Sequence, residues 1–368
     1  MYVYLLLMGA VLVCGYLMPQ SGSNRKNYIV LMAVLHAFIC GFRYMHLTGD
    51  LMKYHTTFNT VAGYGWFSPE LWKEGRNSGM YIFLKLVNHL TGGDYQFVLV
   101  AIAVLTETAF AKLVYRFSPA PWMSYMVWNA LGFYSFGFSA IKQMLAMAFV
   151  IFAVIALLEN NWKKYLLMML LAGSVHAPAL IVLPAYWIAK RKVNIWTLLG
   201  YSVITVLVFI FKDIIVVFMS DFYYEERETM VHSGNLGNRF LMILLIVLCG
   251  VALKGFQERG VEALFHLMVV SMMLQMFSGY NNIFTRLTDY YFQFSAVFIP
   301  MIFYPTGEKK RLNRPRALFV FNAESIRVFK YVVTGVLLYF FWVYTMREGQ
   351  VTTHMDDILN YRFMWDVR

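Results

Sequence analysis

Apolar runs about as long as a membrane-spanning helix constrain this chain more than any other feature. A transmembrane helix needs about 20 predominantly apolar residues, and about 17 is the practical minimum. Runs of that length cover residues 2–18, 95–115, 121–137, 194–211, 238–254, 261–278, 287–304 and 329–346. The shorter runs 28–42 and 144–158 reach it if flanking Tyr and Asn residues extend to the interface. We therefore predict an all-α, polytopic integral membrane protein of about 10 transmembrane helices, forming a single transmembrane domain over residues 1–368.

The composition agrees with a membrane setting. Only 14% of the 368 residues are charged, against about 25% in a soluble domain, and 60% are hydrophobic. The formal net charge of +11 comes from basic residues in short loops between apolar runs, where they orient the chain and meet anionic lipid. The first run lacks a basic segment before it, so we read it as a retained span rather than a secretory signal.

Two apolar segments are shorter than a membrane-crossing helix requires, one because a break divides it and the other over its whole length. Residues 165–189 read YLLMMLLAGSVHAPALIVLPAYWIA, with basic residues at both ends. Because each arm has only about 11 residues, we predict a helical hairpin or a broken helix with His176 near its tip. Residues 80–90 read MYIFLKLVNHL and fit a half-inserted or interfacial helix.

The basic loops then set the orientation by the positive-inside rule. The rule places residues 24–26, 115–117, 160–164, 190–192, 254–259 and 308–316 in the cytoplasm. This layout is self-consistent if neither short segment crosses, and it puts both termini outside and makes residues 305–328 a basic cytoplasmic loop. A second layout, in which each short segment crosses once, also gives a consistent number of crossings, but it places the basic residues 115–117 and 160–164 outside the cytoplasm. We favour the first.

In that layout the outer face collects the polar features. It carries the loop 43–79, the turn around Lys142, residues 212–237 and 278–286, and the C-terminal tail. The inner face is basic and has short loops. We therefore expect the chemistry at the outer side of the membrane or just beneath it.

Several motifs along the chain, in their order and spacing, resemble one family. They are GFRYMHLTGDLMKYHTTF (41–58), FGFSAIKQMLAMAF (136–149), GSVHAP (173–178), NNIFTRLTDYYFQFSAVFIP (281–300) and ILNYRFMW (358–365). The family is EpsG, whose members are Wzy-like bacterial polysaccharide polymerases. Three positions depart from its pattern, with Lys142 in place of arginine, Ala177 in place of serine and Asn360 in place of proline. Lysine keeps the charge but lacks the planar fork that binds phosphate bidentately.

The resemblance implies an enzyme of the bacterial cytoplasmic (inner) membrane. Such polymerases join oligosaccharide repeat units carried on a polyprenyl diphosphate into an exopolysaccharide, capsule or O-antigen. A sugar hydroxyl attacks the anomeric carbon of the growing chain, and the lipid diphosphate leaves. Besides this substrate and membrane lipid, the resemblance implies a flippase and a chain-length regulator of the same pathway as partners.

This reaction requires cations for the diphosphate, a proton acceptor and aromatic surfaces for sugars. The predicted substrate-binding residues are Arg43, Tyr44, Lys142, Gln143, Arg239, Arg286 and Tyr290. For each cation the alternative is a helix-end residue whose charged head reaches the membrane surface. Tyr64, Trp66 and Trp72 of the outer loop are the predicted sugar-stacking side chains.

His176 is the strongest catalytic candidate, because a break in an apolar segment must line protein or water and imidazole exchanges protons near physiological pH. Its alternative is a packing residue. The base stays open. Asp50 follows Arg43 by seven residues, so a helix would align them on one face, but Asp50 also fits a helix N-cap. Glu74 and Asp289 are further alternatives for the base.

The sequence lacks the motifs of several other classes of protein. The chain has no GxxxxGK[ST], no GxGxxG after a strand and no DxD, and its three cysteines form no CxxC pair. We expect no cofactor, no metal and no nucleic acid. The first alternative is a flippase for the same lipid-linked units, which should show two related halves and polar residues reaching both faces. A membrane O-acyltransferase is the second. The absence of an internal repeat and the gathering of candidates on one face favour the polymerase.

Overall fold

The computed structural model describes residues 2–19, 21–45, 47–73, 78–220, 236–253, 259–304, 323–346 and 361–366. Within these ranges the regular elements are all helices, and the sole β-type contact is an isolated antiparallel bridge between Arg43 and Phe363. The predicted all-α class is thus confirmed. The predicted cytoplasmic loop 305–328 and the acidic loop 212–237 lie mostly outside the described residues.

The chain divides into two compact units, each described by itself. The first unit comprises Met1–Leu180 and Ala323–Arg368, and the second comprises Ile181–Asn322. This division concerns contacts within the chain, and the predicted single transmembrane domain remains a prediction.

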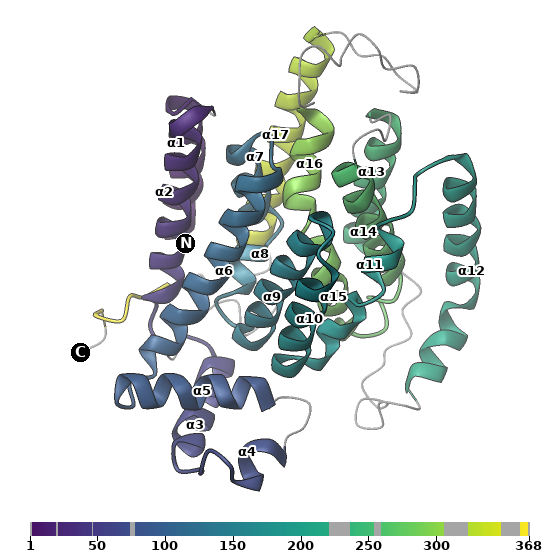
Figure 1. Cartoon of the computed structure of the whole chain (residues 1–368). Coiled ribbons are helices and arrows are strands. Elements are labelled where there is room, and N and C mark those ends of the chain that lie inside the picture. Colours follow the sequence, from purple (N-terminus) through teal and green to yellow (C-terminus); the bar gives the residue numbers. More distant parts are fainter. Residues whose placement is uncertain are drawn as a thin grey trace. The chain divides into compact units, whose positions relative to one another are not determined.

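The first unit is built around α9, whose residues after Lys142 and Gln143 in its first turn are apolar on every face. Its helices are α1 (Tyr2–Leu17), α2 (Gly22–Gly41), α3 (Gly49–Ala62), α4 (Pro69–Lys73), α5 (Ser78–Thr91), α6 (Gln96–Phe117), α7 (Pro121–Ala130), α8 (Phe133–Phe136), α9 (Ile141–Leu158), α10 (Trp162–Val175) and α17 (Ala323–Met346). Helix α9 packs against α10 and α6, and α2 packs along α6 (Figure 1). A helix that is hydrophobic all round is buried, and α9 accordingly has most of its residues in the interior.

Helix α14 is the centre of the second unit. The helices of this unit are α11 (Ala185–Ile188), α12 (Ile195–Ser220), α13 (Gly237–Leu253), α14 (Arg259–Gln275), α15 (Asn282–Phe292) and α16 (Ser295–Phe303). Helix α14 packs against α13, α15 and α16, and also contacts α11 and α12. The short 3₁₀ helix Ala177–Val182 spans the boundary between the two units.

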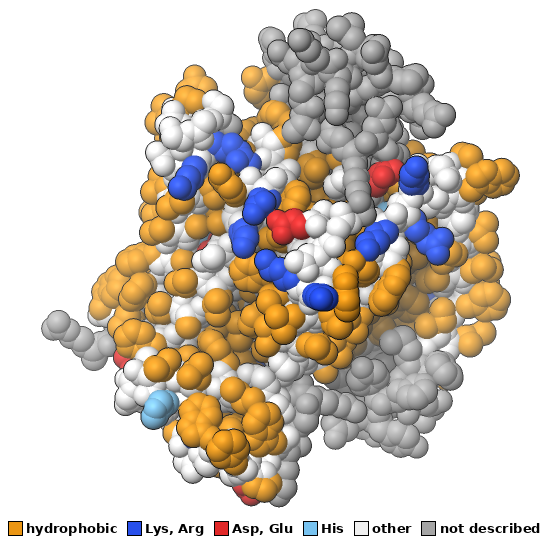
Figure 2. All heavy atoms as spheres, in the orientation of Figure 1, with side chains coloured by type: hydrophobic (Ala, Val, Ile, Leu, Met, Phe, Trp, Pro, Cys, Tyr) orange, Lys and Arg blue, Asp and Glu red, His pale blue; other side chains and the backbone are white. Residues whose placement is uncertain are grey.

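Three described helices are long and apolar enough to cross a membrane: Gln96–Phe117, Ile141–Leu158 and Ile195–Val217. The helix Ile195–Val217 exposes large apolar side chains, among them Trp196, which is 77% exposed, and Ile214, which is 66% exposed. Hydrophobic side chains cover much of the surface visible in Figure 2. Apolar surface of this extent requires an apolar surrounding, as expected for a membrane protein. The larger count of about 10 crossings stays a prediction.

Two predicted continuous helices are interrupted. The run 121–137 divides into α7 and α8, because Gly132 adopts φ 81°, a left-handed conformation that ends a helix and that glycine reaches without strain. The run 287–304 divides at residues 293–294. In a continuous α-helix the Phe294 N–H would donate to the Tyr290 carbonyl, four residues earlier. That carbonyl instead accepts from the Gln293 side-chain amide at 3.1 Å, and the Phe294 N–H donates to the Tyr291 carbonyl at 3.3 Å. This change of acceptor explains why the helix is interrupted here.

The two short apolar segments are helical over part of their length. Residues 80–90 fall within α5, which forms one helix of 14 residues. In the segment 165–189, α10 ends at Val175 and is followed by the 3₁₀ helix Ala177–Val182 and by α11. Pro178 lacks a backbone N–H and disfavours helical geometry in the residue before it. Whether this segment re-enters the membrane remains a prediction.

Candidate functional site

Arg43 lies in the non-helical segment between α2 and α3, in the interior of the first unit. Gly41 precedes it at a point where α2 approaches α6 so closely that a Cβ would lie 3.1 Å from the Val100 Cα. The Gln96 side chain of α6 then holds the segment, since its Nε2 donates to the Gly41 carbonyl at 2.7 Å and to the Arg43 carbonyl at 3.0 Å. This anchoring directs the Arg43 side chain inward, where it is only 1% exposed.

The Arg43 guanidinium meets neutral groups alone among the described residues. It donates to the Cys40 carbonyl, to the Cys40 sulfur at 3.3 Å and to the Gly137 carbonyl at 3.2 Å. It also stands 5.4 Å from the centre of the Phe138 ring, and its Nε has no hydrogen-bond acceptor within the described part of the chain. A buried charge without an opposite charge is costly. The site therefore holds a positive charge that an incoming anion would balance.

The C-terminal segment 361–366 joins this site from more than 300 residues away in the sequence. The Tyr44 N–H donates to the Arg362 carbonyl at 2.8 Å, and the Met364 N–H donates to the Phe42 carbonyl at 3.0 Å. These bonds flank the bridge between Arg43 and Phe363. The structure thus pairs the first motif of the family resemblance with the last, which the sequence order alone did not indicate.

The Tyr361 side chain extends the same contact. Its hydroxyl donates to the Ile39 carbonyl at 2.8 Å, and its ring lies 6.0 Å from that of Phe138. Phe138 in turn contacts the rings of Tyr134 and Tyr4. An aromatic cluster therefore supports the Arg43 segment from the side of the C-terminal residues.

Lys142 and Gln143 lie in the first turn of α9. Ala140 is the residue before the helix, Lys142 is half-buried and Gln143 is buried. Gly137, which accepts from Arg43, lies five residues before Lys142. The first turn of α9 contains no acidic residue. The positive end of the helix dipole and the Lys142 ammonium thus have the same sign, an arrangement that attracts anions.

His176 follows the last residue of α10. Its backbone is extended (φ −148°, ψ 101°), its N–H donates to the Ala172 carbonyl at 2.9 Å, and its own carbonyl accepts from Ala179 at 2.9 Å. The chain folds back here, because Leu180 packs directly over Gly173, where a Cβ would lie 2.5 Å from a leucine methyl carbon. The imidazole is half-buried at this reversal.

Asp50 does not occupy the predicted position. The helix that would align it with Arg43 does not exist, because α2 ends at Gly41, α3 begins at Gly49, and the described residues between them, 42–45 and 47–48, are not helical. The N-cap interpretation is also wrong, since Thr48 caps α3 by accepting from the Leu51 N–H at 3.4 Å. Asp50 instead lies in the first helical turn, 46% exposed and 3.9 Å from Lys53. Glu74, another predicted base, lies outside the described residues.

A buried lysine that the sequence analysis overlooked contacts the segment that carries two of the predicted sugar-stacking residues, Tyr64 and Trp66. Lys85 of α5 donates to the carbonyls of Val61 at 3.3 Å, Ala62 at 3.4 Å and Tyr64 at 2.5 Å, where α3 ends. Its Nζ lies 5.0 Å from the centre of the Trp66 ring. Trp72 donates to the Trp66 carbonyl at 3.2 Å, and both indoles are exposed. The charged residue within the run MYIFLKLVNHL was the available signal.

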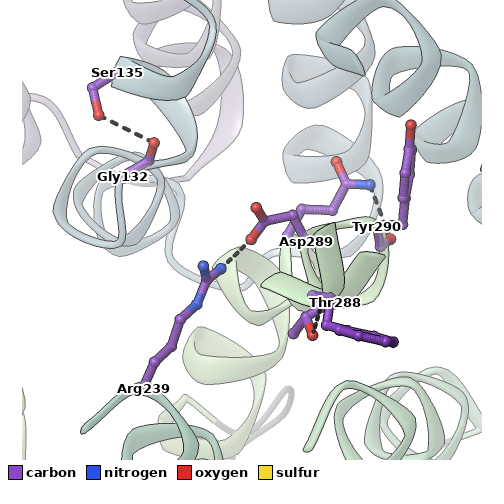
Figure 3. A network of polar contacts seen from close by, with 8 residues as sticks. Gly132, Ser135, Arg239, Thr288, Asp289 and Tyr290 are labelled. Carbon is purple, nitrogen blue, oxygen red and sulfur yellow. Dashed lines mark hydrogen bonds and ion pairs between the residues drawn. The ribbon is translucent and has the colours of Figure 1, made fainter. Parts of the chain in front are cut away.

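The second unit contains its own charged cluster. Arg239 in the first turn of α13 forms an ion pair with Asp289 of α15, as Figure 3 shows, and its guanidinium lies 5.1 Å from the Phe292 ring. Arg286 stands one turn before Asp289 on the same helix and is exposed. Tyr290 is fully buried. Arg239 thus pairs with a carboxylate that the sequence analysis had named only as an alternative base, and Arg286 and Tyr290 lie on the same helix as that carboxylate.

No group of three or more His, Cys, Asp or Glu side chains that could hold a metal ion occurs among the described residues.

A family model matches residues 26–363, nearly the whole chain, and its description is the EpsG family. The protein belongs to the EpsG family. The resemblance read from the motifs is thereby confirmed, and it associates this EpsG protein with polysaccharide production at a membrane. Comparisons with curated proteins and with solved structures returned no match.

Proposed function

We propose that this EpsG protein is a membrane-embedded polymerase that joins oligosaccharide repeat units linked to a polyprenyl diphosphate. The reaction takes place at the outer face of the bacterial cytoplasmic membrane. The hydroxyl oxygen of one unit forms a bond to the anomeric carbon of another, and the bond from that carbon to the diphosphate oxygen breaks. The electron pair leaves with the lipid diphosphate, and the hydroxyl proton passes to a base.

The observation that carries this proposal is the buried, uncompensated guanidinium of Arg43. Its partners among the described residues are carbonyls, a thiol and an aromatic ring, and one of its N–H groups has no acceptor there. Preorganised cations stabilise the charge that develops on a leaving diphosphate, and they act most strongly where water is excluded. Family membership supplies the polysaccharide substrate class.

The remaining predicted residues take roles that follow from their chemistry. Lys142, Arg239 and Arg286 are the further cations for diphosphate or sugar, and Gln143, Tyr44 and Tyr290 orient the substrate. His176 is the first choice for proton transfer, because imidazole can both accept and donate near neutral pH. Asp50 is the second choice, and its exposure to solvent weakens its case as a base that works in a dry site.

The test is turnover of the purified full-length protein, in lipid nanodiscs, with its lipid-linked repeat unit. We expect wild-type protein to give a polymer ladder and His176→Ala to abolish it. Lys142→Ala should lower the rate at least about 100-fold, the effect of removing one oriented group that stabilises the transition state. Lys142→Arg should keep activity if the role of this residue is charge alone.

Lys163→Ala is the matched control, because this lysine is also in the first turn of its helix, α10, but is exposed on a predicted cytoplasmic loop. It should leave the ladder unchanged. Unchanged ladders in both His176→Ala and Lys142→Ala would refute the site. Transfer of the lipid-linked unit across the membrane without glycosidic bond formation would identify a flippase instead.

A further inference from the structure

Helix α5 contacts both the chain reversal at His176 and the loop that carries the exposed tryptophans. At the beginning of α5, Gly79 meets α10 so closely that a Cβ would lie 2.7 Å from the Ser174 carbonyl carbon. Only glycine, which has no Cβ, allows two backbones to approach in this way. Ser174 stands two residues before His176. The beginning of α5 therefore lies next to the chain reversal at His176.

Further along the same helix, Lys85 holds Trp66 in place. The Lys85 ammonium lies 5.0 Å from the centre of the Trp66 ring, and the Trp66 carbonyl accepts from the Trp72 indole N–H at 3.2 Å. A ring held on both sides of its residue loses little conformational freedom when a ligand stacks on it. Lys85 is six residues after Gly79, which is on the order of 10 Å along a helix. An oligosaccharide of a few sugars covers such a length.

The surroundings of these two indoles are polar. Trp66 is 41% exposed and Trp72 is 51% exposed. The exposed His89 ring lies 6.2 Å from the Trp66 ring. Helices α3 and α4 both pack against α5 (Figure 1). Exposed polar side chains of α3 are Lys53, Thr56, Asn59 and Thr60. Polar side chains are costly on a surface that faces lipid, whereas aromatic rings beside hydrogen-bonding groups suit a ligand that is apolar on its ring faces and polar at its edges, as a sugar is.

We propose that Trp66 and Trp72 form the subsite of the acceptor oligosaccharide, and that α5 places its terminal sugar hydroxyl at His176. The two reacting units need different sites. The donor carries the leaving diphosphate, for which the Arg43 guanidinium is the proposed partner. The acceptor instead reacts through a hydroxyl whose proton must reach a base, and His176 is the first choice for that base. The inference rests on the proposed function in taking polymerisation as the reaction, and it adds a sugar subsite to it.

The first experiment measures sugar binding alone. Its probes are oligosaccharides released by mild acid from the polysaccharide of the host cells, which carry neither lipid nor diphosphate. Their affinity for the full-length protein in nanodiscs is measured by a saturation-transfer NMR titration. Trp66→Ala should lower this affinity about tenfold, at the upper end of the effect of one stacked ring. Trp162→Ala is the matched control, because this exposed indole also has a lysine beside it but lies at the opposite end of α10 from His176. It should leave the affinity unchanged.

The second experiment tests whether α5 places the sugar at His176. In Gly79→Ala the added methyl group forces α5 away from α10, while the contacts between Lys85 and Trp66 are kept. We expect the oligosaccharide affinity to stay within about twofold of wild type and the kcat of polymerisation to fall at least about tenfold, because a misplacement of about 1 Å costs up to about 100-fold. Gly200→Ala is the control, since a Cβ there would meet no atom within 4 Å, and it should change neither value.

The outcomes separate this inference from the proposed function. Polymer formed by the wild type with an unchanged oligosaccharide affinity in Trp66→Ala would overturn the sugar subsite alone. A smaller quenching of fluorescence by brominated lipid in that variant than in wild type would then identify a membrane-anchoring surface. Equal losses of affinity and turnover in Gly79→Ala would overturn the placement by α5. A wild-type protein that binds the oligosaccharide through Trp66 but forms no glycosidic bond would refute the proposed function and leave the sugar subsite standing.

Discussion

Replacement of Arg43 by methionine separates a residue kept for function from one kept for stability. The change removes the bonds to the Cys40 and Gly137 carbonyls. Charge-assisted hydrogen bonds contribute about 1.5–3 kcal/mol each, so the gross loss is about 3–6 kcal/mol. The same change removes a buried cation whose desolvation costs several kcal/mol, on the order of 3–5 kcal/mol after relaxation. Methionine also keeps contact with the Phe138 ring through its sulfur.

These terms nearly cancel, and we expect Arg43→Met to change the free energy of unfolding by less than about 1 kcal/mol. Polymerisation should be lost, because the buried positive charge is gone. The free energy is measured by denaturing the purified protein in mixed detergent micelles with increasing sodium dodecyl sulfate, and activity is measured from the polymer ladder.

Arg25 provides a control at the other end of the same helix. It donates to the carbonyls of Val114, Tyr115 and Ser118 near the end of α6, at 3.3, 2.8 and 3.0 Å, but it is half-exposed. Because its desolvation cost is small, Arg25→Met should lower the free energy of unfolding by about 1–2 kcal/mol, and activity should remain. A larger loss of stability in Arg43→Met than in Arg25→Met, with polymer still formed, would refute the reasoning.

Two further changes test how the helices hold the site. Gly41→Ala places a Cβ 3.1 Å from the Val100 Cα, a backbone atom that cannot move alone. The free energy of unfolding should fall by about 1–3 kcal/mol, as for other overpacked interiors. A change smaller than the error of the denaturant titration would contradict this contact. Asn161→Ala removes the side chain that accepts from the Lys164 N–H at 3.0 Å. It should cost about 1 kcal/mol, typical of a lost N-cap, and leave the activity intact, whereas unchanged stability would show that solvent caps α10 equally well.

Much of the secondary structure was predictable because it depends on local pattern. The apolar runs 95–115 and 144–158 correspond closely to α6 and α9, and the small-residue break before His176 falls at the end of α10. The two interruptions were not predicted. Gly132 and Gln293 break helices through a backbone conformation and a side-chain hydrogen bond, neither of which changes the hydrophobic pattern.

The candidate residues could be chosen from their type and their position in the sequence, but the groups that each of them contacts could not be predicted. Arg43, Arg239 and Arg286 were chosen as cations near helix ends. No pattern in the sequence indicated that Arg43 would donate to the Gly137 carbonyl, five residues before Lys142, or that Asp289 would pair with Arg239. Asp50 was misplaced because one helix was expected to carry both Arg43 and Asp50, whereas α2 ends at Gly41 and α3 begins at Gly49.

The sequence by itself determined the helical class, the membrane setting and the family, because these depend on hydrophobic runs and on motifs that are read within about 20 residues. Tertiary structure decided which charges meet. The pairing of residues 361–366 with the Arg43 segment joins positions more than 300 residues apart, and the Arg239–Asp289 pair joins two helices. Such contacts depend on how whole helices pack, and the spacing of residues along one helix carries no record of the neighbour that each side chain will face.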